Sequence, residues 1–190
     1  GSHTAEFLYG SFADRELHDT VYVTANVQPY VYRDALECHH VEHAWLDGYD
    51  PETGTVPPDA LAEAALAAAE RFPRKRVVAH FLQPHYPFLG PTGQEHFDLD
   101  RLDFEWYKLL SGELEVSDAV VERAFKENLD VVLPEVERLF GEFSGKTVVT
   151  ADHGQVIGER GFPVPIREYG HPRGVYSEGL VTVPWLTYEN

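Results

Sequence analysis

The sequence predicts an α/β fold in which helices cover a mainly parallel central sheet in a three-layer sandwich. Three short segments rich in β-branched and aromatic residues have the composition of buried strands, at 19–26, 76–82 and 146–151. Helical segments separate them along the chain, and such alternation is typical of parallel sheets. A chain of 190 residues is long enough for one well-packed domain and short for two. We therefore expect residues 4–190 to form a single domain.

The first half of the chain contains two of the predicted strands with a helix between them. The strand at 19–26 is followed by a loop-rich region over 27–58. Pro57-Pro58-Asp59 then opens an Ala-rich helix that ends near Phe72, because proline is tolerated in the first turn of a helix. The next strand, at 76–82, ends in a proline-rich turn.

The second half is predicted to contain two helices, a strand, a long loop and a final strand, at 99–110, 119–143, 146–151, 154–179 and 179–188. Ser117 is the expected N-cap of the longer helix, and Pro134 should bend it. Pro184 favours an edge or strand-end position for the final strand, because proline cannot donate to a sheet ladder.

The charge of the chain limits its partners. Acidic residues outnumber basic ones by 32 to 15, which gives a formal net charge of −17. Phosphates would be repelled, so we expect no nucleic-acid partner. A strongly acidic chain with few lysines is typical of proteins adapted to molar salt, and an ordinary acidic protein is the alternative. We therefore predict a cytoplasmic location in a high-salt cytosol. No apolar run approaches the roughly 20 residues of a membrane span.

The most informative segment is the predicted strand at 146–151 with the residues that follow it. Asp152, His153 and Gly154 come directly after the strand, and His171 lies on the loop beyond. Open α/β sheets bind ligands outside the carboxyl ends of their strands. A carboxylate with two imidazoles suits a divalent metal, with Zn or Mn favoured and Ca or Mg also compatible. This pattern predicts a metal site, although an Asp-His pair also occurs at ordinary helix starts.

The turn after the strand at 76–82 carries a second candidate, His85. Prolines on both sides keep its loop extended. Because parallel neighbouring strands end at the same sheet edge, we expect His85 to face Asp152 and His153 and to act as a ligand or an oxyanion donor. His80, inside the strand, is expected to be a core histidine with a hydrogen-bond partner.

Two arginines on the long loop, Arg160 and Arg173, are candidates for binding a sulfate or phosphate group bidentately. Pairing with nearby carboxylates is the alternative for each. The sequence contains no Gly-rich phosphate loop, no Rossmann fingerprint and no Gly-x-Ser-x-Gly elbow, so nucleotide-binding folds and serine esterases of those kinds are not indicated.

The segment Cys38–His43 concentrates a thiol, three imidazoles and a carboxylate. His40 and His43 have the i, i+3 spacing of some metal ligands. No second ligand pair follows at finger-like spacing, so we expect a solvated surface loop rather than a native metal site. Cys38 is the single cysteine, which excludes an internal disulfide and suggests a small, partly buried apolar side chain.

These motifs together resemble the sulfatase-like branch of the alkaline phosphatase superfamily. The resemblance covers about residues 17–188 and rests on four groups of residues in matching order: Gln83-Pro84-His85-Tyr86-Pro87-Phe88, Thr150-Ala151-Asp152-His153-Gly154 with Gly158-Glu159-Arg160, Tyr169-Gly170-His171-Pro172, and Val183-Pro184-Trp185-Leu186. It implies a three-layer α/β fold with a divalent metal. The acidic, lysine-poor composition resembles the members found in extreme halophiles.

The resemblance also implies roles for individual residues. Asp152 and His153 would be metal ligands, and His171 a ligand or a substrate contact. His85 would contact the ester oxygens or protonate the leaving group. A bound cation would neutralise the ester oxygens and lower the pKa of the nucleophile, while a positioned histidine handles the proton.

The family pattern further includes a first strand with metal-binding acidic residues, followed by a helix that begins with a Ser, Thr or modified Cys nucleophile. Both precede the strand that 19–26 resembles, and little sequence precedes it here. We therefore expect both elements to be missing and the nucleophile to be unknown, with Thr24, Ser11 and Thr20 as candidates by elimination. Gly1-Ser2-His3 resembles a tag remnant, so native sequence upstream or a second subunit of a homo-oligomer would complete the site.

Two classes of function follow from this pattern. The first is a metal-dependent hydrolase or transferase that acts on small sulfate or phosphate esters. The alternative is a non-catalytic sulfatase-like domain that keeps a partial site and binds an anionic ligand or a protein partner.

Overall fold

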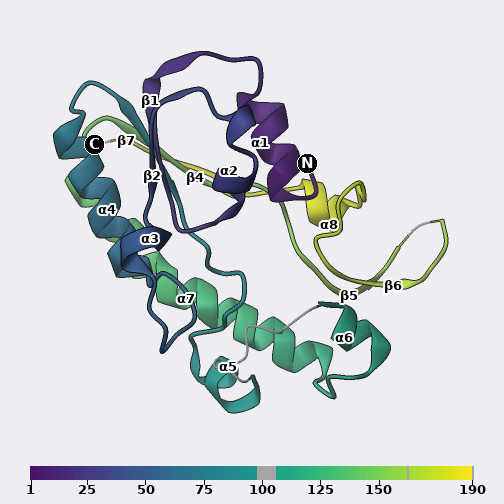
Figure 1. Ribbon diagram of the computed structural model, residues 1–190. Coiled ribbons are helices and arrows are strands. Elements are labelled where there is room, and N and C mark those ends of the chain that lie inside the picture. Colours follow the sequence, from purple (N-terminus) through teal and green to yellow (C-terminus); the bar gives the residue numbers. More distant parts are fainter. Residues whose placement is uncertain (98–105, 162, 190) are drawn as a thin grey trace.

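The computed structural model describes residues 1–97, 106–161 and 163–189, in which helices and short strands alternate (Figure 1). The strands are β1 (Leu17–Thr24), β2 (Cys38–His43), β3 (Arg76–His80), β4 (Lys146–Thr150), β5 (Val156–Arg160), β6 (Arg167–Gly170) and β7 (Trp185–Glu189). The helices are α1 (Thr4–Phe12), α2 (Gln28–Val31), η1 (Arg33–Ala35), α3 (Trp45–Gly48), α4 (Pro58–Arg71), α5 (Pro91–His96), α6 (Trp106–Ser111), α7 (Asp118–Glu142) and α8 (Glu178–Val181). None of the helices in these ranges has the length and apolarity to span a membrane.

A small parallel sheet with the strand order β2-β1-β3 organises the first half of the chain. Its central strand is apolar on both faces, and Val21, Tyr22 and Val23 are wholly buried. That continuous burial is expected for a parallel strand covered by helices on both sides. Helix α1 packs on one face, where Leu8 lies in the cluster around Tyr22. Helix α4 packs on the other face, where Leu61 joins Val21 and Val23. The α/β class is thereby confirmed, and the parallel pairing is confirmed for the small sheet of β1, β2 and β3.

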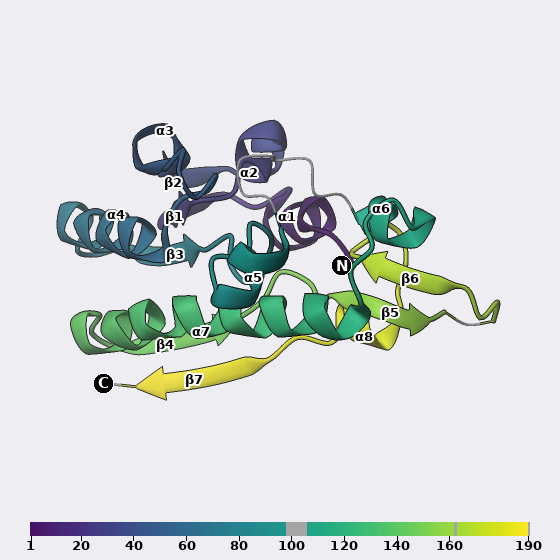
Figure 2. The same cartoon turned by 90° about the horizontal axis from the view of Figure 1, so that it is seen from below.

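The long helix α7 organises the second half. Strand β4 pairs antiparallel with β7, and β5 pairs antiparallel with β6. Figure 2 shows α7 alongside β4, β7 on the outer side and the β5–β6 hairpin extending away from the other elements. The strands of the described residues thus form three separate sheets, where the sequence predicts one central sheet. The difference arises because β4 hydrogen-bonds to β7, so the ends of β3 and β4 meet without pairing.

Several element predictions are confirmed and others are wrong. The helices predicted at 59–72 and 119–143 are observed as α4 and α7, and Pro134 lies inside α7. The predicted loop-rich region 27–58 contains α2, β2 and α3, and the predicted loop 154–179 contains β5 and β6. These elements span four to six residues each, too few to show a clear periodicity in sequence.

Three further segments complete the comparison with the predicted elements. The final strand begins at Trp185 instead of 179, because α8 occupies part of that segment. Residues 99–105 of the predicted helix at 99–110 lie outside the described residues, and α6 covers the remainder. Before β1 the chain forms the nine-residue helix α1, which the sequence patterns did not predict.

Candidate functional site

Side chains from five segments that are distant in sequence meet beyond the carboxyl ends of β3 and β4. The two strand ends approach each other through His80 and Asp152, whose Nε2 and Oδ2 atoms lie 3.8 Å apart. The N-terminus of α1, the turn after β3 and the loop after β6 complete the group. We call it the polar cluster, and its members are His3, Thr4, His80, His85, Asp152, His153 and His171.

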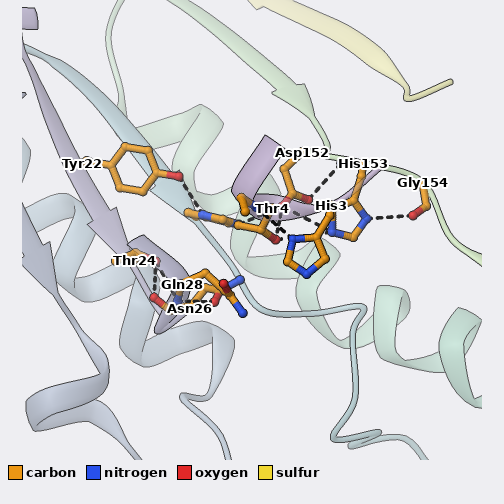
Figure 3. A network of polar contacts seen from close by, with 11 residues as sticks. His3, Thr4, Tyr22, Thr24, Asn26, Gln28, Asp152, His153 and Gly154 are labelled. Carbon is orange, nitrogen blue, oxygen red and sulfur yellow. Dashed lines mark hydrogen bonds and ion pairs between the residues drawn. The ribbon is translucent and has the colours of Figure 1, made fainter. Parts of the chain in front are cut away.

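Thr4 connects α1 to the end of β4. Its side chain is almost fully buried, and its hydroxyl donates to Asp152 Oδ2 at 2.7 Å (Figure 3). The same hydroxyl oxygen lies 3.4 Å from His153 Nε2. His3 caps the helix, since its Nδ1 accepts from the Ala5 amide at 3.1 Å. The first turn of α1 therefore holds a hydroxyl between a carboxylate and an imidazole.

The hydrogen bonds of His153 fix which of its ring nitrogens carries the proton. Nδ1 lies 2.8 Å from the carbonyl oxygen of Gly154. A carbonyl only accepts, so Nδ1 donates and the neutral ring presents an unprotonated Nε2. That Nε2 lies 3.5 Å from Asp152 Oδ2 and also faces Thr4. Two electron-pair donors thus stand next to one hydroxyl.

His80 supports the carboxylate from the side of the parallel sheet. Its side chain is largely buried, as expected for a core histidine, and its Nδ1 lies 2.7 Å from the Tyr22 hydroxyl. With Tyr22 donating to Nδ1, the proton of His80 sits on Nε2 and points toward the Asp152 carboxylate. Figure 3 shows the Tyr22 hydroxyl pointing toward the side of the cluster where Thr4 and Asp152 lie.

His85 and His171 form the far side of the cluster. His85 Nδ1 lies 2.7 Å from the Tyr86 carbonyl oxygen, so Nδ1 donates and Nε2 stays unprotonated in the neutral ring. The ring centroids of His85 and His171 are 5.3 Å apart. His171 stacks on His153 at 4.3 Å, and its buried Nδ1 has no hydrogen-bond partner among the described residues. The sequence predicts that His85 faces Asp152 and His153, whereas the structure places its ring against His171, which in turn stacks on His153.

Burial and mutual repulsion favour the neutral form of four imidazoles of the cluster, those of His3, His80, His85 and His171. Burial, followed by the charges of His153, His85 and His3, lowers the pKa of His171 to about 3. Burial is also the main cause that lowers the pKa values of His3, His80 and His85. Burial opposes ionisation of Asp152, yet the histidines beside it and the Thr4 hydroxyl bring the pKa of its carboxyl below the ordinary value. At neutral pH, Asp152 is therefore an anion, and His3, His80, His85 and His171 are neutral.

The polar cluster contains carboxylate and imidazole atoms of the kinds that bind metal ions, but they are not arranged as a complete metal site. In residues 1–97, 106–161 and 163–189, no group of three or more His, Cys, Asp or Glu side chains is arranged to hold a metal ion. Asp152 Oδ2 and His153 Nε2, at 3.5 Å, are close to the separation of about 3.3 Å that follows from zinc–ligand bonds in a tetrahedral site. His171 offers an unpartnered nitrogen but stacks face to face on His153, with 26° between the rings. A third bond would require its ring to turn.

The two candidate arginines are in different situations. Arg160 lies on β5 and donates from Nη1 to the Pro165 carbonyl at 2.9 Å, within its own hairpin. Arg173 follows His171 by two residues, and its charge contributes to the lowered pKa of His3, after burial and His153. Arg173 therefore acts electrostatically on His3 of the polar cluster, whereas Arg160 is engaged in the hairpin.

The nucleophile candidates chosen by elimination are not in the cluster. Thr24 donates to the Asn26 carbonyl, and Thr20 donates to Asp19. Sequence reasoning missed Thr4 because it assigned no helix before β1. The available signal was the spacing of the buried residues Ala5, Leu8 and Phe12, which marks one face of a helix.

Residues 1–3 belong to the environment of the site, although their sequence resembles a tag remnant. Ser2 is fully buried, and its hydroxyl donates to the Pro172 carbonyl at 3.0 Å. The ring of His3 lies 5.3 Å from that of His171.

No family model, no curated protein and no solved structure matches this chain. Because function resides in the arrangement of a site rather than in a fold class, the polar cluster carries the functional argument.

Proposed function

We propose that the chain is a metal-dependent hydrolase of small phosphate or sulfate esters and that Thr4 supplies the attacking oxygen. The supporting observation is the Thr4 hydroxyl at the start of α1, 2.7 Å from Asp152 Oδ2 and 3.4 Å from His153 Nε2. A hydroxyl becomes a useful nucleophile when an adjacent base accepts its proton. Of the two neighbours of Thr4, the Asp152 carboxylate is the proton acceptor, because the pKa of its carboxyl lies below the ordinary value.

The first step would be attack of Thr4 Oγ1 on the phosphorus or sulfur atom. The new bond joins this oxygen to the central atom, the bond to the ester oxygen breaks, and the alkoxide or phenoxide leaves and takes a proton from water. The proton of the Thr4 hydroxyl passes to Asp152 Oδ2, which lies within hydrogen-bond distance. In the second step, water attacks the Thr4 ester and gives its proton to the unprotonated Nε2 of His85. The bond to Thr4 Oγ1 breaks, Thr4 takes its proton back from Asp152, and inorganic phosphate or sulfate leaves.

Asp152, His153 and His171 are the residues that would hold a divalent cation, whose charge would lower the pKa of the Thr4 hydroxyl and neutralise ester oxygens. His3 is suited to bind an ester oxygen directly. Its Nδ1 accepts from the Ala5 amide, so its Nε2 carries the proton and can donate. Arg173 adds positive charge on the same side. These groups favour an anionic tetrahedral ester without distinguishing phosphate from sulfate.

The proposal is tested by replacing the Thr4 hydroxyl. Thr4→Ala should abolish hydrolysis of 4-nitrophenyl phosphate or sulfate, measured with Zn²⁺ or Mn²⁺ in molar KCl, because no other described hydroxyl contacts Asp152. Thr4→Ser keeps the hydroxyl and should retain a substantial fraction of the activity. Ser11→Ala, on the same helix but outside the cluster, is the matched control and should behave as the wild-type protein.

Acid quenching during turnover should trap the phosphoryl or sulfuryl group on Thr4, detectable by peptide mass spectrometry. Full activity in Thr4→Ala would contradict the assignment of the nucleophile. If the wild-type protein hydrolyses neither ester but binds phosphate or sulfate at the cluster, the non-catalytic alternative replaces the enzyme.

A further inference from the structure

Glu6 connects the N-terminal residues to the loop after β6, and both segments carry histidines of the polar cluster. Its Oε2 accepts from the Ser2 amide at 2.8 Å and from the Ser2 hydroxyl at 3.3 Å. Its Oε1 accepts from the Gly174 amide at 3.0 Å and from the Tyr176 hydroxyl at 3.3 Å. One carboxylate in the first turn of α1 therefore binds donors from the N-terminal residues and from the loop after β6.

That loop, residues 171–177, carries two groups of the proposed site. His171 stacks on His153 at one end, and Arg173 precedes the amide that Glu6 binds. The loop is largely exposed between Pro172 and Gly174, so little apolar packing holds it there. A further hydrogen bond to the N-terminal residues runs from the Ser2 hydroxyl to the Pro172 carbonyl, and Ser2 is itself bound to Glu6. The ring of His3 also lies 5.3 Å from that of His171.

We infer that Glu6 is a positioning residue, which fixes the 171–177 loop on the first turn of α1 and so sets the place of His171 relative to Thr4 and Asp152. The inference rests on the proposed function for its catalytic meaning. The bonds from the Ser2 and Gly174 amides are among the causes that lower the pKa of the Glu6 carboxyl, so it stays ionised at neutral pH. Groups that orient ligands in this way typically change metal affinity or activity by about 10–100-fold when removed.

A purely local role for Glu6 is the competing explanation. An acidic residue in the first turn of a helix interacts favourably with the helix dipole, and its loss would then weaken α1 alone. Glu127 supplies a matched comparison. This second half-buried glutamate also accepts from a backbone amide and a hydroxyl, both of Thr92, at 2.7 Å each, but it joins α7 to α5.

The experiment compares Glu6→Gln with Glu127→Gln in the metal-free chain by NMR. In Glu6→Gln, the side-chain NH2 group would face either the Ser2 donors or the Gly174 and Tyr176 donors and could not accept a hydrogen bond from them. The Gly174 amide should therefore exchange at least about tenfold faster, and the ring resonances of His171 should shift. Glu127→Gln should instead accelerate exchange at Thr92 and leave Gly174 and His171 as in the wild-type protein. Zn²⁺ titration should then show weaker binding in Glu6→Gln and unchanged binding in Glu127→Gln.

Unchanged Gly174 exchange and His171 resonances in Glu6→Gln would overturn the inference, as would equal changes in Glu127→Gln. If Glu6→Gln does not fold, Tyr176→Phe removes one donor without altering α1, and the same changes should appear at smaller amplitude. Absence of those changes there would also contradict it. A wild-type chain that binds no Zn²⁺ would count against the proposed function, while the exchange and ring measurements still decide the role of Glu6.

Discussion

Two regions of this chain contain several histidines, and they differ in whether the histidine side chains come together. The segment Cys38–His43 has three histidines within six residues, whereas the polar cluster collects its histidines from segments spread between residues 3 and 171. The dense segment forms the edge strand β2, and its histidines do not converge. The dispersed histidines come together around Asp152. Proximity in sequence is therefore a poor guide to a site.

The geometry of a strand explains why β2 does not gather its imidazoles. Successive side chains point to opposite faces, so His40 and His43 lie on different sides despite their i, i+3 spacing. His40 pairs with Glu42, two residues along on its own face, at 2.9 Å. The ring of His43 packs against Tyr30 and Trp45. The prediction of a loop here is wrong, because the segment forms β2.

The side chains of the polar cluster are positioned in a different way. Each of its groups comes from the end of an element, where the backbone leaves the sheet or helix and side chains can point into a common space. Neighbouring polar atoms then fix the proton positions on His153 and His85. The comparison predicts that changes in the cluster have large effects on function and stability and that changes in β2 have small ones.

The largest contrast is expected in metal binding. Asp152→Ala and His153→Ala should each abolish stoichiometric binding of Zn²⁺ or Mn²⁺ and leave the circular dichroism spectrum of the fold intact. His40→Ala should bind the metal as the wild-type protein does. Calorimetric titration with elemental analysis in molar KCl measures all three. Equal metal occupancy in Asp152→Ala and the wild-type protein would contradict the prediction that the polar cluster, and not β2, binds the metal.

The next effect is a pH dependence of stability that the cluster introduces. His171 has a pKa of about 3 in the fold against an ordinary value of 6.5, so the unfolded chain binds an extra proton between these values. The contribution of His171 to the free energy of unfolding should be constant above pH 6.5. It should decrease as the pH falls toward 3, by about 5 kcal/mol at most. Urea unfolding with a chelator at about pH 7, 5 and 4 measures the slope. His171→Leu should reduce the slope, with the remainder coming from the other buried histidines and Asp152, and an unchanged slope would disprove the assignment.

A smaller but still substantial effect is expected at Asn128, which holds the turn that carries His85. This residue is wholly buried in α7. Its Nδ2 lies within hydrogen-bond distance of the carbonyl oxygens of Pro84, His85 and Pro87, and its Oδ1 accepts from the Leu89 amide at 2.9 Å. Asn128→Ala leaves these groups without a partner and should lower the free energy of unfolding by about 3 kcal/mol. Chemical denaturation is the measurement, and a loss under about 1 kcal/mol would contradict the support assigned to this turn.

The smallest effect is expected in β2 itself. His40 and Glu42 have side chains that are 31% and 40% exposed, so solvent screens their pairing. Their coupling energy in a double-mutant cycle should be below about 1 kcal/mol. Thermal or chemical unfolding of His40→Ala, Glu42→Ala and the double variant provides it. A coupling well above that value would show that β2 holds more than a surface pair.

The sequence alone determined the elements that have a clear local signature. The strands β1, β3 and β4 have concentrated β-branched residues, and α4 and α7 are long enough for the helical period to appear. It also pointed to the residues at the strand ends, Asp152, His153 and His85, because a buried strand that stops at polar residues leaves them at the edge of a sheet.

Only the tertiary structure decided which of these residues share a site and what joins them. Thr4 and Asp152 are 148 residues apart in sequence, and neither α1 nor the pairing of β4 with β7 has a signal strong enough to place them together. Side-chain hydrogen bonds, burial and ring stacking depend on contacts between distant segments. Local composition fixes the propensity of each segment, whereas the choice of partners follows from packing all segments at once, and the polar cluster is a product of that choice.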